Sequence, residues 1–222
     1  MLLIIANKNY SSWSMRPWLV LKHFNIPFQE ETILLKKQNT RQQILEYGKN
    51  PLGTLPILID DDLIIQDSLA ICEYLADIYS QLNLWPQTLK QKAQARSIVA
   101  QMHSSFVHLR QNYNMNIKRQ SKPNDKTIRE DNSKLDADIK RIEQIWTELL
   151  IQNTQENKPY LFGDFSIADA FFAPVVTRFY SYGVDINKAC QKYMQDIINT
   201  PAVKAWINLA KTETEIIHEY EV

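Results

Sequence analysis

The chain has 222 residues, and its 25 Lys and Arg residues balance 25 Asp and Glu residues, which gives a formal net charge of zero. This balance argues against nucleic acid or a membrane surface as a partner attracted by charge. The length allows two modest domains with a substantial hydrophobic core. The apolar run at residues 2–5 is too short for a signal peptide or a membrane span, so we expect a cytoplasmic protein.

The first informative segment is a cluster of serines between a predicted strand and a predicted helix. The strand is predicted at Leu2–Ala6, and apolar residues at helical spacing predict a helix over 15–24 with Ser14 as its N-cap. Ser11, Ser12 and Ser14 would then lie at a helix N-terminus, where backbone N–H groups and the helix dipole favour negative charge. Two interpretations stay open: the hydroxyls bind an anionic group, or they only cap the helix and turn the chain.

Strand and helix signals continue to alternate through the first third of the chain. A second strand follows the first helix, a polar helical stretch is predicted at 40–47, and Pro56 opens a third strand. A fourth strand is predicted at 63–65, and Asp67-Ser68 opens an apolar helix. The predicted order is β-α-β-α-β-β-α, which describes an α/β domain.

This order of motifs resembles the thioredoxin-like domain of glutathione transferases, and the resemblance extends over essentially the whole chain. Pro56 resembles the cis-proline of that family, and an X–Pro bond is the kind of peptide bond that adopts the cis form. The resemblance implies that the backbone of Leu55 pairs with the cysteinyl amide of glutathione. It also implies that Asp67 and Ser68 hold the γ-glutamyl end of glutathione. Taken singly, Leu55-Pro56 could form a trans turn and Asp67-Ser68 a plain N-cap.

The chain becomes helical after a break near 83–86. Apolar residues at intervals of three and four predict long helices over 91–118 and 125–151. The segment Ser166-Ile167-Ala168-Asp169 is a predicted capping box at the start of another apolar helix. The resemblance implies a thioredoxin-like domain at residues 1–80, a linker at 81–87 and an all-α domain at 88–222.

A serine hydroxyl would supply the chemistry that the resemblance implies, which is ionisation of the glutathione thiol. Lowering a thiol pKa from ~8.5 by ~2 units takes ~2.7 kcal/mol. One hydrogen bond to a charged acceptor supplies roughly 1.5–3 kcal/mol, and a helix N-terminus adds about 0.3–1 kcal/mol. We slightly favour Ser11 as the donor, with Ser12 close behind and Ser14 third. The two cysteines form no metal motif, so we expect no metal, and the resemblance implies glutathione as co-substrate.

The electrophile is expected between the two domains, against the first long helix of the all-α domain. His103 could donate a proton or contact the substrate, or it could be a hydrogen-bonded histidine between the domains. The aromatic side chains could equally belong to the core. The implied partners are glutathione, a small hydrophobic electrophile and a second copy of the chain, because family members usually form two-fold dimers. The candidate pocket residues are Tyr10, Trp13, His103, Phe106, Arg110 and Tyr113.

Three functions remain open from the sequence. The first is a serine-type glutathione transferase that adds the thiolate to small apolar electrophiles in detoxification. The second is a glutathione-dependent isomerase or peroxidase, which would use the same thiolate. The Ser-Ser-x-Ser-x-Arg run from Ser11 resembles the zeta class, to which maleylacetoacetate isomerase belongs, but Trp13 stands where that class has cysteine. The third is a non-catalytic protein that binds glutathione or another ligand.

Overall fold

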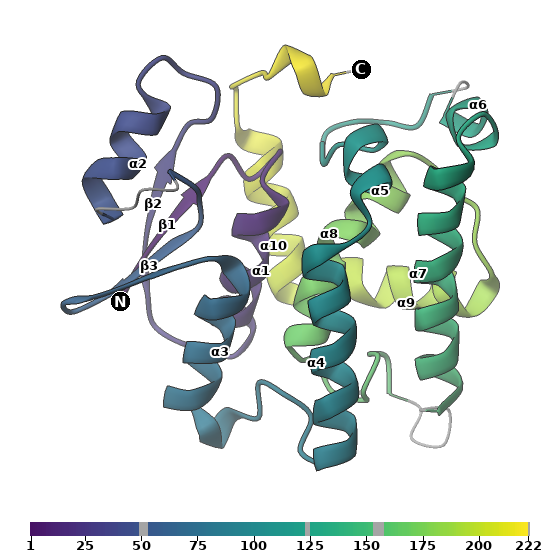
Figure 1. Cartoon of the computed structure of the whole chain (residues 1–222), viewed down its shortest axis with the longest axis horizontal. Coiled ribbons are helices and arrows are strands. Elements are labelled where there is room, and N and C mark those ends of the chain that lie inside the picture. Colours follow the sequence, from purple (N-terminus) through teal and green to yellow (C-terminus); the bar gives the residue numbers. More distant parts are fainter. Residues whose placement is uncertain (49–52, 123–124, 153–157, 222) are drawn as a thin grey trace.

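The computed structural model of the chain describes residues 1–48, 53–122, 125–152 and 158–221. Its first part contains a sheet and three helices, and its second part is helical (Figure 1), so the predicted fold class is confirmed. The elements in chain order are β1 (Leu2–Ala6), α1 (Ser12–His23), β2 (Gln29–Ile33), α2 (Thr40–Gly48), β3 (Ile57–Asp60), β4 (Leu63–Gln66), α3 (Ser68–Ile78), η1 (Ser80–Leu82), α4 (Leu89–Ser104), α5 (Val107–Asn112), α6 (Asp125–Glu130), α7 (Ser133–Gln152), α8 (Ile167–Ser181), α9 (Lys188–Asn199), α10 (Pro201–Thr212) and η3 (His218–Tyr220).

The four strands form one mixed sheet in the order β2-β1-β3-β4. Strand β1 runs parallel to β2 and antiparallel to β3, and β3 pairs antiparallel with β4. Successive side chains of a strand point to opposite faces, so the uninterrupted apolar sequence of β1 fits a strand covered on both sides. Leu3 and Ile5 join the large core that includes α1 and α3, while Ile4 packs with Ile44 of α2. Helix α1 therefore lies between the sheet and helix α8 of the helical domain.

The two long helices predicted for the second domain are each interrupted, so their predicted spans were wrong. The first ends at Ser104, because Ser105 is extended and Phe106 has a positive φ of 58°, which an α-helix does not accommodate. The second is divided into α6 and α7 at residues 131–132. Apolar periodicity continues across both interruptions, so the sequence pattern alone did not reveal them.

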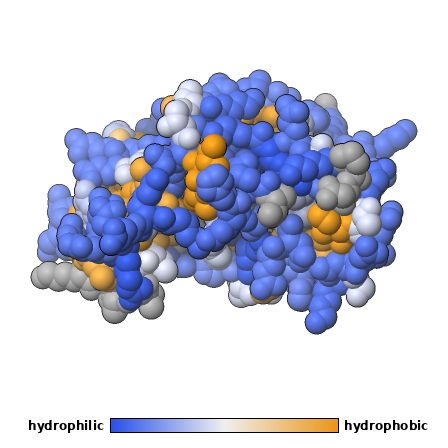
Figure 2. Space-filling model, turned by 90° about the horizontal axis from the view of Figure 1, so that it is seen from above, coloured by the Kyte–Doolittle hydropathy of each residue, from blue (hydrophilic) through white to orange (hydrophobic). Residues whose placement is uncertain are grey.

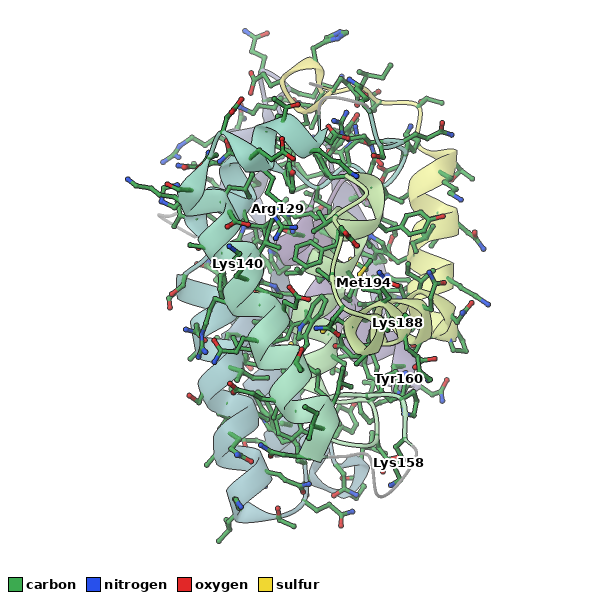
Figure 3. All side chains as sticks on the ribbon, turned by 90° about the vertical axis from the view of Figure 1, so that its right-hand side faces the viewer. Arg129, Lys140, Lys158, Tyr160, Lys188 and Met194 are labelled. Carbon is green, nitrogen blue, oxygen red and sulfur yellow. The ribbon has the colours of Figure 1, made fainter. Side chains whose placement is uncertain are left out.

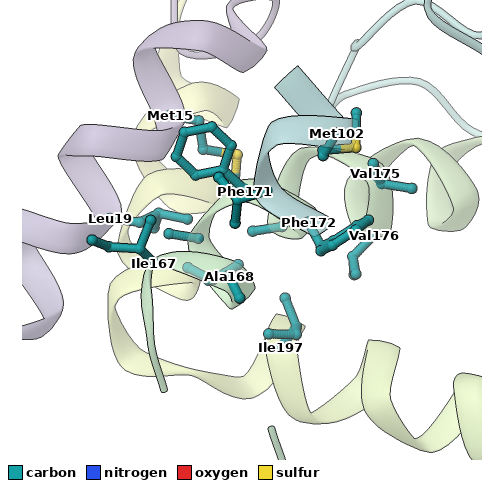
Figure 4. Packing of buried hydrophobic residues seen from close by; sticks show 14 of the residues in the cluster. Met15, Leu19, Met102, Ile167, Ala168, Phe171, Phe172, Val175, Val176 and Ile197 are labelled. Carbon is teal, nitrogen blue, oxygen red and sulfur yellow. The ribbon is translucent and has the colours of Figure 1, made fainter. Parts of the chain in front are cut away.

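Helix α8 is the centre of the molecule. Its side chains pack with Met15 and Leu19 of α1, Met102 of α4 and Ile197 of α9 (Figure 4). The predicted capping box at its start is confirmed. The Ser166 Oγ accepts a hydrogen bond from Ala168 N–H at 3.2 Å, and the Asp169 carboxylate accepts one from Ser166 N–H at 3.0 Å. Because α8 touches elements of both domains, it can fix the position of α1 relative to the helical domain.

The surface is mainly polar on the faces that the figures present. Hydrophobic side chains form small, separate patches on the face seen in Figure 2. On the outer side of the helical domain, Lys140 of α7 and Lys188 of α9 are exposed (Figure 3). Among the described residues, no helix combines the length and the apolar character needed to cross a membrane.

Candidate functional site

The serine hydroxyls at the start of α1 have different hydrogen-bond partners. Ser11, and not Ser14 as predicted, is the N-cap: its backbone is extended and its Oγ accepts from Ser14 N–H at 3.2 Å. The Ser11 hydroxyl donates to Ser14 Oγ at 2.9 Å, and Ser14 Oγ accepts from Ala6 N–H at 3.0 Å. The predicted cap was wrong because the helix begins three residues earlier, and Ser14 instead links the helix to the end of β1.

Ser12 is the first residue of α1 and differs from its neighbours in contacting the helical domain. Its Oγ accepts a hydrogen bond from Nη2 of Arg178 at 3.2 Å. Arg178, in α8, is 5% exposed, and its other nitrogens donate to the carbonyls of Tyr113, at the end of α5, at 2.9 Å and of Pro174 in α8 at 3.2 Å. Within the described part of the chain, the Ser12 hydroxyl donates to no protein acceptor. Its proton is therefore available to a ligand.

Three arginines surround this end of α1. The Arg16 guanidinium is fully buried between the rings of Trp13, at 4.2 Å, and Phe171, at 4.6 Å. Burial, with the charges of Arg178 and Arg110, lowers the pKa of Arg16 to about 9, and burial with the charge of Arg110 lowers the pKa of Arg178 to about 10. All three stay cationic at neutral pH. None of the three forms an ion pair with a described carboxylate, so their positive charges gather at this end of α1.

A cavity of about 290 Å³ opens beside these groups. Phe106 and Tyr113 are buried in the core and, like His103, are not among its lining residues. A larger cavity of about 440 Å³ lies against α6 and α7, but none of the α1 serines lines it, so we place the candidate site at the smaller one. The walls of the smaller cavity include Tyr10, both Ser11 and Ser12, Trp13, Arg110, Arg178 and Tyr220.

The residues predicted to bind glutathione itself lie at the start of β3 and of α3. The Leu55–Pro56 peptide bond is cis, as predicted. Asp67 is the N-cap of α3, and its carboxylate accepts hydrogen bonds from two backbone N–H groups of the first turn. The Ser68 hydroxyl is buried, 3.4 Å from Nη1 of Arg16. Arg16 therefore connects the start of α3 with the Trp13 wall of the cavity.

The C-terminal segment 213–221 lies over the loop that precedes α1. The Glu213 carboxylate accepts hydrogen bonds from the backbone N–H groups of Lys8, at 2.6 Å, and Asn9, at 2.9 Å. The Glu221 carboxylate accepts from the Tyr10 hydroxyl at 2.6 Å. Burial, together with this hydrogen bond, raises the pKa of Tyr10. The Tyr10 hydroxyl is thus committed to the C-terminal segment, although its ring lines the cavity.

Sequence reasoning missed Arg178 and Glu213. Arg178 carried a signal, because it is a single cation inside the apolar stretch that follows the capping box, and a buried cation requires partners. Glu213 carried no such signal, since it lies in a polar segment with three other glutamates. Its role depends on two backbone groups more than 200 residues away in the sequence.

Comparison with known proteins agrees with this architecture. Residues 10–78 match the family model of the glutathione S-transferase N-terminal domain, and residues 125–208 match that of the C-terminal domain. Glutathione S-transferase GstB of Escherichia coli is 24% identical over 208 residues, which cover 91% of this chain and 96% of GstB. Maleylacetoacetate isomerase of Dictyostelium discoideum is 36% identical over 90 residues, covering 40% of this chain and 41% of the isomerase.

Among solved structures, a glutathione transferase homologue from Burkholderia with bound glutathione superposes with a TM-score of 0.71. Its identity is 20%, and the match covers 96% of this chain and 98% of the homologue. At this identity the superposition shows only that the two proteins share a fold. The two matched domain models belong to one family and together span more than half of the chain, in the order in which the sheet and the helices occur. The chain therefore belongs to the glutathione S-transferase family of enzymes.

Proposed function

We propose that the Ser12 hydroxyl donates a hydrogen bond that stabilises the thiolate of glutathione, whose proton leaves to solvent, and that the thiolate attacks a small electrophile in the adjoining cavity. The observation that carries this proposal is the pattern of hydrogen bonds at the three serines. The Ser11 proton is committed to Ser14 Oγ, whereas Ser12 Oγ accepts from a buried guanidinium and keeps its proton. The sequence alone slightly favoured Ser11, but these contacts favour Ser12.

The contacts are sufficient in magnitude for this chemistry. A neutral hydroxyl that accepts a charge-assisted hydrogen bond becomes a stronger donor to a thiolate. One such bond contributes roughly 1.5–3 kcal/mol, and the N-terminus of α1 contributes about 0.3–1 kcal/mol. Together these reach the ~2.7 kcal/mol that lowers a thiol pKa by ~2 units. The positive charges of Arg16, Arg110 and Arg178 act in the same direction.

The ligand's other groups have matching partners at the start of α3. The Asp67 carboxylate suits the γ-glutamyl ammonium, and the Ser68 hydroxyl beside Arg16 suits the γ-glutamyl carboxylate. Leu55, before the cis bond, would pair with the cysteinyl amide. We further propose a cytoplasmic homodimer, supported by family membership alone. A monomer mass in light scattering would refute the dimer.

The test is the ultraviolet thiolate absorbance of enzyme-bound glutathione, titrated on both sides of ~8.5, the pKa of a free thiol. We expect an apparent thiol pKa well below that value in the wild-type protein. Ser12→Ala should raise it by about 1 to 2 pH units, which is the loss of one hydrogen bond to a charged group. Ser11→Ala is the matched control: it removes the cap of α1, at about 1 kcal/mol of folding stability, and should move the thiol pKa much less.

The same two variants also give the results that would contradict a role for Ser12 in thiol ionisation. A raised thiol pKa in Ser11→Ala with an unchanged one in Ser12→Ala would make Ser11 the donor. No change in either would exclude serine activation. A bound thiol with an ordinary pKa in the wild-type protein would favour the third function considered from the sequence, a protein that binds glutathione without turnover.

A second candidate function is glutathione-dependent isomerisation of an anionic substrate. It is favoured by the cationic walls of the cavity, since Arg110 and Arg178 both line it and pair with no described carboxylate. The Dictyostelium relative is named a maleylacetoacetate isomerase, which agrees with this possibility. Initial rates with a neutral electrophile and with an unsaturated dicarboxylate, compared at low and high salt, separate the two functions. Preference for the dicarboxylate that weakens with salt supports isomerisation.

A further inference from the structure

The carboxylate of Asp67 is almost fully engaged before any ligand binds. Its Oδ1 accepts from Leu69 N–H at 2.8 Å and from Ala70 N–H at 3.2 Å, which occupies both lone pairs of that oxygen. Its Oδ2 lies 3.1 Å from Nε2 of His103. One acceptor position on Oδ2 is left, and the Asp67 side chain is 45% exposed, so a ligand can reach it. An ammonium group bound by Asp67 must therefore share Oδ2 with His103.

The backbone of Asp67 indicates that this arrangement is held in place by its surroundings. Asp67 has a φ of 79°, outside the helical and extended regions that a residue with a side chain normally adopts. Such a conformation is strained and persists where neighbouring contacts require it. The contacts at Asp67 are the first turn of α3 and the imidazole of His103.

His103 is itself fixed between the domains. Its ring meets the edge of Trp13, with the ring centroids 5.3 Å apart, and it lies near Phe171 of α8. Its Nδ1 is buried and has no partner within the described residues. A proton on Nδ1 would therefore lack an acceptor, which assigns the neutral tautomer with its hydrogen on Nε2. Burial, with the charges of Arg16 and Arg110, lowers the pKa of His103 and agrees with a neutral ring, although Asp67 opposes this effect.

We propose that His103 is a positioning residue for the γ-glutamyl ammonium of glutathione. Its Nε2–H fixes the orientation of the Asp67 carboxylate so that the remaining lone pair of Oδ2 faces the ligand. The consequence is that a side chain of helix α4, in the helical domain, sets the affinity of the ligand site on the thioredoxin-like domain. His103 acts on glutathione affinity and not on the reacting sulfur, since it does not line the cavity beside Ser12. This inference rests on the proposed binding of glutathione.

The experiment pairs variants of His103 with a change in the ligand. Calorimetry measures Kd for glutathione and for its analogue that lacks only the γ-glutamyl amino group. His103→Leu removes the donor, and His103→Gln retains a side-chain N–H. We expect His103→Leu to weaken glutathione binding roughly fivefold to tenfold, the size of one lost hydrogen bond, and to leave the affinity of the deaminated analogue within about twofold. His103→Gln should recover most of the glutathione affinity, and kcat should change less than KM.

Other results for these variants would overturn the role proposed for His103. An equal loss of affinity for both ligands in His103→Leu would overturn the proposal, because the histidine would then act only by packing. Asp67→Asn supplies a second variant: in that background, His103→Leu should cause no further loss of glutathione affinity, and an additional loss would also overturn it. If His103→Leu does not fold, His103→Phe, which keeps a ring against Trp13 and Phe171 but has no donor, carries the same comparison. Absence of glutathione binding by the wild-type protein would refute the proposed function instead.

Discussion

Glu213 should be required for the stability of the loop that carries the serines. The Glu213→Ala substitution removes the acceptor of two backbone N–H groups, those of Lys8 and Asn9. These residues are 6% and 0% exposed, so water cannot easily replace the carboxylate. An unsatisfied buried donor costs about 1–3 kcal/mol, which sets an upper range of about 2–6 kcal/mol for the pair. Because Glu213 itself is half-buried and water can enter from its side, we expect the lower half, about 2–4 kcal/mol.

Urea unfolding followed by tryptophan fluorescence measures this loss as a change in the free energy of unfolding. Glu213→Gln keeps one acceptor oxygen and should lose roughly half as much. The matched control is Glu215→Ala in the same segment, where the carboxylate pairs with the partly exposed Lys37 on the surface. Such a pair contributes about 0–1 kcal/mol.

The same variants test whether the loop held by Glu213 affects ionisation of the glutathione thiol. The loop held by Glu213 leads directly into Ser11 and Ser12, so Glu213→Ala should also raise the thiol pKa of bound glutathione. A free energy of unfolding within about 0.5 kcal/mol of the wild-type value, as for an ordinary surface substitution, would refute the reasoning. A large loss of stability in Glu215→Ala would show that the whole segment, and not the Glu213 carboxylate, holds the loop.

Two further outcomes are expected elsewhere in the fold. Asp169→Asn should lower the free energy of unfolding by about 2–4 kcal/mol in urea, because the buried carboxylate accepts four hydrogen bonds, and the exposed control Asp164→Asn should change it by less than about 0.5 kcal/mol. His23 stacks on Phe165 at 4.0 Å and burial lowers the pKa of its imidazole below 6.5. The unfolded chain then binds this proton more tightly, so stability should fall as pH drops below about 6.5. His23→Phe keeps the stacked ring and should reduce this loss of stability at low pH. The same pH dependence of the free energy of unfolding in His23→Phe and in the wild-type protein would contradict a role for His23.

The sequence predicted the features that depend on local chemistry. The apolar run of β1 and the Leu-Pro pair before β3 indicated their structures correctly, because each depends on residues close together in the chain. The capping box at Ser166 and Asp169 was also confirmed, since its two hydrogen bonds join residues two and three positions apart. Local patterns failed where apolar periodicity was preserved through a break, as at Phe106, and where several serines competed for one cap.

The tertiary structure decided how the candidate site is assembled. Ser12 and Arg178 lie 166 residues apart, and Glu213 reaches Lys8 across 205. Neither separation leaves a periodic signal in the sequence, because these contacts follow from the packing of α8 against α1 and from the return of the C-terminal segment over the loop. The sequence by itself determined the family, the fold class and the serines as candidates, since these depend on local motifs in a shared order. Which hydroxyl keeps a free proton, and which charges surround it, depends on side chains that only folding brings together.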